Sequence, residues 1–219
     1  MGRVSVEIET ATLEAAFSAD YYFSAPDSFR ADIHGLLGTT AGAMISIGDS
    51  AVAYFPSKGT LFVAVGNPEE ENPVLGLRFG FSDLMKAMIG FSGIGKEDSL
   101  VLFDSDGEIY ELSFDRGPEM IRLEVLPTVW VPSSKQVFTK DGVSTLDIGY
   151  YDFIESEGSI RAKRIIITNP VRGEVVKMSI EKEYIGRKLP EGLFEIDVPD
   201  DIEIWKLTQG VHREKKTAY

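Results

Sequence analysis

The stretch Gly90–Glu97, GFSGIGKE, has the residue types of a phosphate-binding loop, because it matches the first seven positions of G-x-x-x-x-G-K-[ST]. The eighth residue of such a loop is Ser or Thr, which holds Mg²⁺, whereas the carboxylate of Glu97 would repel the phosphates. A phosphate loop also follows a strand and precedes a helix. Here a helix-like stretch precedes the motif, and a strand-like stretch, DSLVLF, follows it. This order predicts that Gly90 ends a helix and that the motif binds no nucleotide.

Two other motifs suggest chemistry but fit their surroundings poorly. The stretch DSDGEIYE, residues 104–111, begins like a calcium loop, yet it lacks the third acidic position and the flanking helices. A β-hairpin turn explains it better. The stretch SIEK, residues 179–182, matches the S-x-x-K of penicillin-recognising enzymes, which requires a helix. In an alternating strand, Ser179 and Lys182 point to opposite faces.

Neither histidine has a recognisable catalytic partner. His34 lies on the polar face of an expected strand, and His212 lies in a polar C-terminal stretch. The chain has no cysteine, and two histidines without cysteine make a poor metal site. No spacing of acidic residues singles out a catalytic pair. We therefore predict no catalytic residue, no metal, no cofactor and no enzymatic activity, with a hydrolase of unrecognised site as the weakest alternative.

The charge and hydropathy of the chain argue against nucleic acid as a partner and against a membrane-spanning helix. The 219 residues carry a formal net charge of -13, which repels nucleic acid at long range, so we expect no nucleic-acid partner. No run approaches the ~18 apolar residues of a membrane-spanning helix. The start, MGRVSVEIE, contains no apolar signal core, and it is equally compatible with an export signal that has been removed.

Alternation with a period of two residues dominates the chain and predicts antiparallel strands. In SFRADIHGLLG, Phe29 and Ile33 share one face, with Arg30 and His34 on the other. The same pattern recurs in MIRLEVL, STLDIGYYDF and EVVKMSIEKEY, and turn signals separate these runs. The spacing predicts a meander of roughly ten strands with one solvated face each.

One short stretch, FSDLMKAMIG, predicts a helix that ends at Gly90. Leu84, Met88 and Phe91 follow at helical spacing, and Met85 extends their apolar face. Antiparallel strands could curl around an apolar interior with this helix as a plug or lid. Two interpretations stay open, a filled core or a cavity for an apolar ligand. The candidate lining residues are Phe29, Ile33, Leu84, Met85, Met88 and Phe91.

The order of these segments resembles the bacterial lipoprotein-sorting proteins of the LolA/LolB-like family. The similar segments are SFRADIHGLLGTTAGAMISIGDSAVAYFPSKGTLFVAV, FGFSDLMKAMIGFSG, VSTLDIGYYDFIESEGSIRAKRIIITNP and MSIEKEYIGRKLPEGLFEIDVPDDIEIWKL. The resemblance rests on pattern and order over nearly the whole chain. It implies a mainly β (α+β) fold, in which one curved antiparallel sheet forms a half-open barrel with a short helix over its concave face. It further implies a single domain over residues 1–207 and a polar tail over 208–219.

The resemblance also implies a function in which no bond is made or broken. Family members bind the acyl chains of lipoproteins or lipids in an apolar cavity and bring lipoproteins to the outer membrane. Arg30 matches the position of an Arg that bonds to the lid, although alternation places it opposite the apolar face. Leu36 and Leu37, or alternatively Leu75, match a loop that touches the membrane.

The implied partners are acyl chains and the outer-membrane surface, and the implied location is the periplasm. Anchoring through a lipid on a removed N-terminal Cys stays open, and a monomer is expected. The alternative is an envelope interaction or assembly lipoprotein that has the same fold, a filled core and no lipid cargo.

Overall fold

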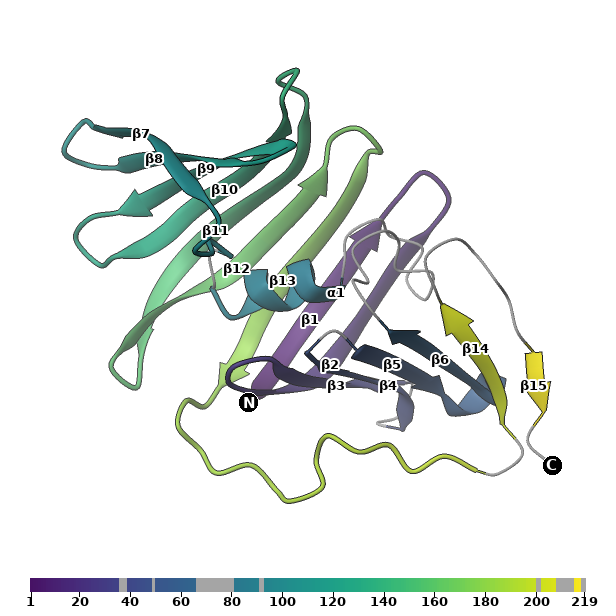
Figure 1. Cartoon of the computed structure of the whole chain (residues 1–219). Coiled ribbons are helices and arrows are strands. Elements are labelled where there is room, and N and C mark those ends of the chain that lie inside the picture. Colours follow the sequence, from purple (N-terminus) through teal and green to yellow (C-terminus); the bar gives the residue numbers. More distant parts are fainter. Residues whose placement is uncertain are drawn as a thin grey trace. The chain divides into compact units, whose positions relative to one another are not determined.

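A computed structural model describes residues 1–35, 39–48, 50–65, 81–90, 93–199, 202–207 and 215–217 (Figure 1). Within these residues the chain forms fifteen strands, one α-helix, α1 (Phe81–Met88), and one 3-10 turn, Pro56–Lys58. The strands are β1 (Gly2–Glu9), β2 (Glu14–Ser24), β3 (Ser28–His34), β4 (Thr40–Ile47), β5 (Ser50–Phe55), β6 (Thr60–Val65), β7 (Ser99–Ser105), β8 (Tyr110–Arg116), β9 (Glu119–Leu126), β10 (Val131–Thr139), β11 (Ser144–Ser156), β12 (Ser159–Asn169), β13 (Glu174–Glu183), β14 (Glu203–Leu207) and β15 (Lys215–Thr217).

All fifteen strands belong to one sheet, in the order β15-β14-β6-β5-β4-β3-β2-β1-β13-β12-β11-β10-β9-β8-β7. The order ends at β15 and β7, so the sheet is not closed. Most neighbours are consecutive antiparallel strands, and β14 pairs with β6 in parallel. This confirms the predicted mainly β fold with one unclosed, largely antiparallel sheet and a short helix. More strands form than the roughly ten expected, and one of them, β15, lies in the expected polar tail.

The chain divides into two compact units, which are described separately. Unit 1 contains Met1–Ser5, Phe17–Ser82 and Glu181–Tyr219, and unit 2 contains Val6–Ala16 and Asp83–Ile180. Strands β1, β2 and β13 each contribute residues to both units. The single domain over residues 1–207 stays a prediction. Part of the expected polar tail, Lys215–Thr217, pairs with β14 as strand β15.

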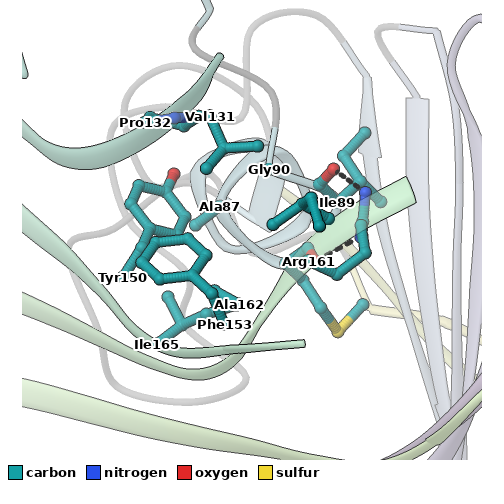
Figure 2. A pocket seen from close by; sticks show the side chains of 12 residues that line it. Ala87, Ile89, Gly90, Val131, Pro132, Tyr150, Phe153, Arg161, Ala162 and Ile165 are labelled. Carbon is teal, nitrogen blue, oxygen red and sulfur yellow. Dashed lines mark hydrogen bonds between the residues drawn. The ribbon is translucent and has the colours of Figure 1, made fainter. Parts of the chain in front are cut away.

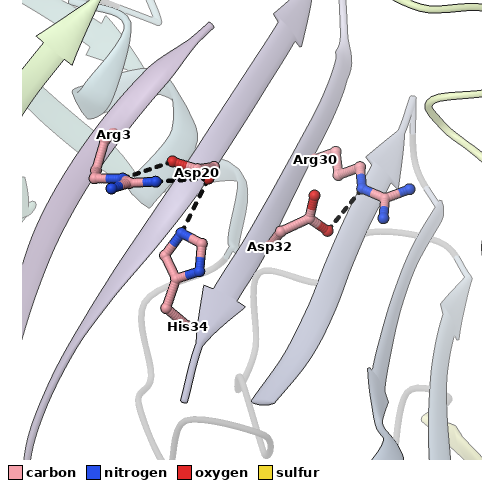
Figure 3. A network of polar contacts seen from close by, with 5 residues as sticks. All are labelled: Arg3, Asp20, Arg30, Asp32 and His34. Atoms are coloured by element: carbon pink, nitrogen blue, oxygen red, sulfur yellow. Dashed lines mark hydrogen bonds and ion pairs between the residues drawn. The ribbon is translucent and has the colours of Figure 1, made fainter. Parts of the chain in front are cut away.

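The core of unit 1 follows the alternation read from the sequence. Phe29 and Ile33 of β3 are buried, and the Phe29 ring stacks on Tyr21 of β2 with 6.5 Å between centroids. The opposite face is polar: Arg3 donates to both Asp20 oxygens at 2.8 and 3.1 Å, and His34 Nε2 lies 3.0 Å from the same carboxylate (Figure 3). The Arg3 guanidinium lowers the pKa of Asp20. His34 therefore lies in a cross-strand network of polar contacts.

The core of unit 2 lies on one face of β9 to β13. The fully or almost fully buried side chains on this face are Ile121, Ile148, Ile165, Ile167, Val176 and Met178. They occupy alternate positions, as a sheet with one packed and one solvated face requires. This face includes the positions predicted from MIRLEVL, STLDIGYYDF and EVVKMSIEKEY, and it is the surface on which the site described below is built.

The two turn motifs adopt the conformations predicted for them. Gly107 has a φ of 91°, and the Asp106 carboxylate accepts hydrogen bonds from the backbone N–H groups of Glu108 and Ile109, both at 2.9 Å. This is an Asx-type hairpin turn between β7 and β8. Gly90 has a φ of 72°, and its N–H donates to the Ala87 carbonyl at 3.0 Å. Gly90 is therefore the glycine that ends α1.

Candidate functional site

Helix α1 carries the apolar face that the sequence predicts. Met85, Ala87 and Met88 are buried, and Leu84 is half-buried. Asp83 lies in the first turn and Lys86 in the last, which suits the helix dipole. A helix of eight residues is too short to be stable alone in water, so its contacts with the rest of the protein must hold it in place.

Arg161 of β12 binds the C-terminal end of α1. Its Nη2 donates to the Met88 carbonyl at 3.1 Å, and its Nη1 donates to the Ile89 carbonyl (Figure 2). The last carbonyls of a helix have no partners within the helix and form the negative end of its dipole. A guanidinium at this place therefore supplies both hydrogen-bond donors and an opposite charge.

Arg116 of β8 holds the segment that follows α1. It donates to the Gly93 carbonyl at 2.5 Å and to both Asp98 oxygens at 2.7 and 2.6 Å. Asp98, whose side chain is shielded from solvent, also accepts from the Gly95 N–H at 2.7 Å. The Arg116 guanidinium, together with this backbone bond, lowers the pKa of Asp98 to about 2. The glycine-rich motif is thus a loop organised around an internal carboxylate.

Lys135 of β10 is a buried lysine beside α1, with 4% of its surface exposed. Burial lowers the pKa of Lys135, and the charge of Asp83 in α1 acts in the opposite direction. A Cβ added at Gly93 would lie 3.2 Å from Lys135 Nζ, so the amine packs against the loop. A glycine at position 93 leaves room for this amine.

A cavity of about 50 Å³ lies between the end of α1 and strands β10, β11 and β12 (Figure 2). Its lining residues are Ala87, Met88, Ile89, Gly90, Val131, Pro132, Tyr150, Phe153, Ile160, Arg161, Ala162 and Ile165. The lining is mostly apolar, and the volume suffices for one or two water molecules but not for an acyl chain.

Tyr150 of β11 brings a hydroxyl into this apolar lining. The residue is 3% exposed, and within the described part of the chain its hydroxyl oxygen has no hydrogen-bond partner. Burial raises the pKa of Tyr150, and the charge of Arg161 opposes that rise. The phenol is therefore a neutral donor at physiological pH. Figure 2 shows its ring beside Phe153 and its oxygen on the side of Val131 and Pro132.

The predicted site residues separate into three groups. Met88 lines the cavity, and Leu84 and Met85 lie on the same helix. Phe29 and Ile33 belong to the core of unit 1. The remaining predictions, which lie outside the described residues, are Phe91, Leu36, Leu37 and Leu75. The ligand-binding and membrane-touching roles of all these residues stay predictions.

Arg30 has partners in its own unit. Its Nη1 donates to the carbonyls of Leu193 and Glu195 at 2.7 and 3.0 Å, and its Nε donates to Asp32 at 2.8 Å (Figure 3). The lid bond of Arg30 stays a prediction, while the guanidinium recorded on α1 is that of Arg161.

Sequence reasoning missed Tyr150, Arg161 and Lys135 as site residues. For Lys135 a signal existed, because the residue is in phase with buried Val137 on an alternating strand. A lysine at a core-facing position is rare unless it is paired.

No known protein-family profile matches the sequence, and no curated protein matches it. Solved structures do. A domain of Vibrio parahaemolyticus described as an outer membrane lipoprotein-sorting protein superposes with a TM-score of 0.68 at 13% identity, over 89% of this chain and 88% of that one. A LolA superfamily protein of Nitrosomonas europaea gives a TM-score of 0.59 at 16% identity, over 89% and 88%. The chain has a LolA-like fold.

A DUF1329 family protein of Desulfovibrio piger has the same LolA-like fold, with a TM-score of 0.65 at 12% identity over 88% of both chains. The resemblance read from the sequence is thereby confirmed at the level of the fold. At these identities the likeness concerns architecture, and function has to be argued from the site. In the described residues, no helix is long and apolar enough to cross a membrane, and no three acidic or histidine side chains form a group that could hold a metal ion.

Proposed function

We propose that this protein binds acyl chains of lipids or lipoproteins without catalysis, in the bacterial envelope, and that α1 is the lid of the binding space. The observation that carries the proposal is the Arg161 contact with α1. A short helix with buried methionines lies over an apolar cavity. Its end is held by hydrogen bonds from the Arg161 guanidinium, and these bonds can break and re-form. The LolA-like fold supports the proposal by analogy.

The physical basis is the exchange of one apolar surface for another. If α1 lifts, the buried side chains of Met85 and Met88 leave their places, and an acyl chain can replace them. Each buried methylene contributes about 0.8 kcal/mol, so a chain of ordinary length can offset the contacts that α1 loses. Methionine adapts its shape to different chains because its side chain is flexible. The cavity of about 50 Å³ would then be the space that remains when the lid is closed.

Native mass spectrometry of the purified protein, with extraction and lipid analysis, is the direct test. We expect a co-purifying lipid, or uptake of an added acyl-chain fluorophore. Met88→Asp should weaken uptake at least about tenfold, because it places a carboxylate in the lining. Val171→Asp is the matched control, since Val171 is 62% exposed in a turn. A clean apo mass without probe uptake by the wild-type protein would refute the acyl-binding function.

A second candidate function is that of an envelope interaction or assembly protein with a filled core. The end strand β7 favours it, because its apolar residues Leu100, Val101, Leu102 and Phe103 are each about half exposed. An exposed apolar edge strand is a place where another chain can pair. This candidate predicts no acyl uptake, together with a complex that Leu102→Lys weakens. The probe experiment therefore separates the two functions.

A further inference from the structure

The Tyr150 hydroxyl is a buried polar group that the described part of the protein leaves without a hydrogen-bond partner. The residue is 3% exposed, lies on a cavity wall, and has no hydrogen-bond partner among the described residues. Leaving a buried hydroxyl unpaired is unfavourable, and a phenylalanine would pack equally well at this position. Such a group on a cavity wall points to a ligand that completes its hydrogen bonding.

The rest of the lining defines what this ligand group must be. Arg161 is the other hydrogen-bonding side chain of the lining, and its two Nη atoms are engaged with α1. The Arg161 charge acts on Tyr150 and favours electron-rich groups near it. The Tyr150 hydroxyl can donate one hydrogen bond. The matching group is an oxygen acceptor attached to an apolar body.

We propose that the Tyr150 hydroxyl donates a hydrogen bond to the carbonyl oxygen at the head of a bound acyl chain. The carbonyl can come from the carboxyl group of a free fatty acid or from the ester of a lipid, because both present the same acceptor. The proposal rests on the function proposed above and adds a fixed position for one end of the chain. The carbonyl occupies the cavity beside Tyr150, and the hydrocarbon lies along the apolar face that α1 uncovers.

The test compares Tyr150→Phe with the wild-type protein. The variant removes one oxygen from a buried site, so it should fold and have equal or higher thermal stability. Tyr151→Phe is the matched control, because Tyr151 is the next residue, is 43% exposed and contacts Arg164. Three competitors displace an acyl-chain fluorophore: palmitic acid, methyl palmitate and hexadecane. They share chain length and differ in the head oxygen.

We expect Tyr150→Phe to weaken the binding of palmitic acid, of methyl palmitate or of both by about tenfold, and to leave the binding of hexadecane unchanged. Tyr151→Phe should change the binding of none of the three. The weakened competitor identifies the carbonyl source. An infrared spectrum of ¹³C-carbonyl methyl palmitate gives a second readout. Its carbonyl band should shift on binding to the wild-type protein and shift less on binding to Tyr150→Phe.

Two outcomes overturn the proposal, and they differ. If all three competitors bind and Tyr150→Phe weakens none of them, acyl binding stands, but Tyr150 does not hold the carbonyl. A water molecule would then be its partner. If none of the three binds to the wild-type protein, the proposed function fails, and the role of Tyr150 fails with it.

Discussion

Arg161 of β12 and Met88 of α1 are joined by a hydrogen bond of 3.1 Å from the guanidinium to the backbone carbonyl. A second bond goes from the same guanidinium to Ile89. The acceptors are the last residue of α1 and the residue that follows it, so one side chain of the sheet fixes the end of the helix. Because backbone carbonyls accept the bonds, the contact does not depend on the side chains of α1. Substitutions of apolar residues in α1 would leave this attachment in place.

Arg161→Gln should loosen α1. The variant loses charge-assisted bonds to two carbonyls, which should lower the free energy of unfolding by about 1–2 kcal/mol. Amide hydrogen exchange of residues 85–90 should accelerate about tenfold or more, and acyl probes should enter faster. The control is Arg164→Gln on the same strand, because Arg164 is 46% exposed and pairs with Asp152. Equal exchange of α1 in wild type and Arg161→Gln would contradict the lid attachment.

Asp98→Asn should make the stability less dependent on acid pH. The folded-state pKa of Asp98 is about 2, below the ordinary value of 3.8 for an aspartate, so its ion pair stabilises the fold above pH ~4. This stabilisation is lost as pH falls through ~4 to ~2. Since Arg116 is 30% exposed, we expect about 1–2 kcal/mol between wild type and variant at neutral pH. Urea denaturation from pH 6 to pH 2 should show the difference shrinking, and a constant difference would exclude this role.

Lys135→Met should stabilise the protein at neutral pH. Burial lowers the pKa of Lys135, so the folded state disfavours its charge below that pKa. This penalty on the folded state decreases as pH rises from the folded-state pKa towards 10.5, the ordinary pKa of a lysine. Methionine has a similar volume and no charge, so the variant should have a free energy of unfolding about 1 kcal/mol higher at pH 7, with a smaller gain at pH 10. Lys163→Met at an exposed position is the control, and a variant less stable than wild type at pH 7 would contradict the prediction.

Ile167→Ala should be among the most destabilising substitutions in unit 2. Its side chain is fully buried, so the variant loses burial and leaves a cavity, which costs about 3–4 kcal/mol. Ile154→Ala on β11 should cost less than about 1 kcal/mol, because Ile154 is 43% exposed. Chemical denaturation of both variants measures the difference. Similar losses of stability in the two variants would contradict the different burial of Ile167 and Ile154.

The predictable part of the fold is the part that depends on local alternation. In STLDIGYYDF, alternation places Ile148 and Tyr150 on one face because they are two residues apart, and both are buried. The helix end at Gly90 was predicted from residue type, and its positive φ agrees. Strand β15 was not expected, because Lys215–Thr217 lies in a polar stretch without alternation and forms a strand by backbone pairing with β14.

The site could not be predicted in the same way because its partners are distant in sequence. Arg161 is 73 residues from Met88, and only the order of the strands brings β12 to the helix end. Nothing near Arg161 in the sequence distinguishes it from Arg164, which pairs with Asp152 on the neighbouring strand. The absence of a partner for Tyr150, in the part of the chain that is described, is likewise a property of the packed structure.

The burial of Lys135 makes this residue an internal reporter for chemical footprinting. An acetylating reagent should modify exposed lysines such as Lys163 at once and should spare Lys135, whose amine packs against Gly93. Any movement of α1 and its following loop away from β10 would admit the reagent. Peptide mass spectrometry gives the ratio of modification at Lys135 to that at Lys163. This ratio would then report the fraction of molecules in which α1 has moved, without a label on the lid or the ligand.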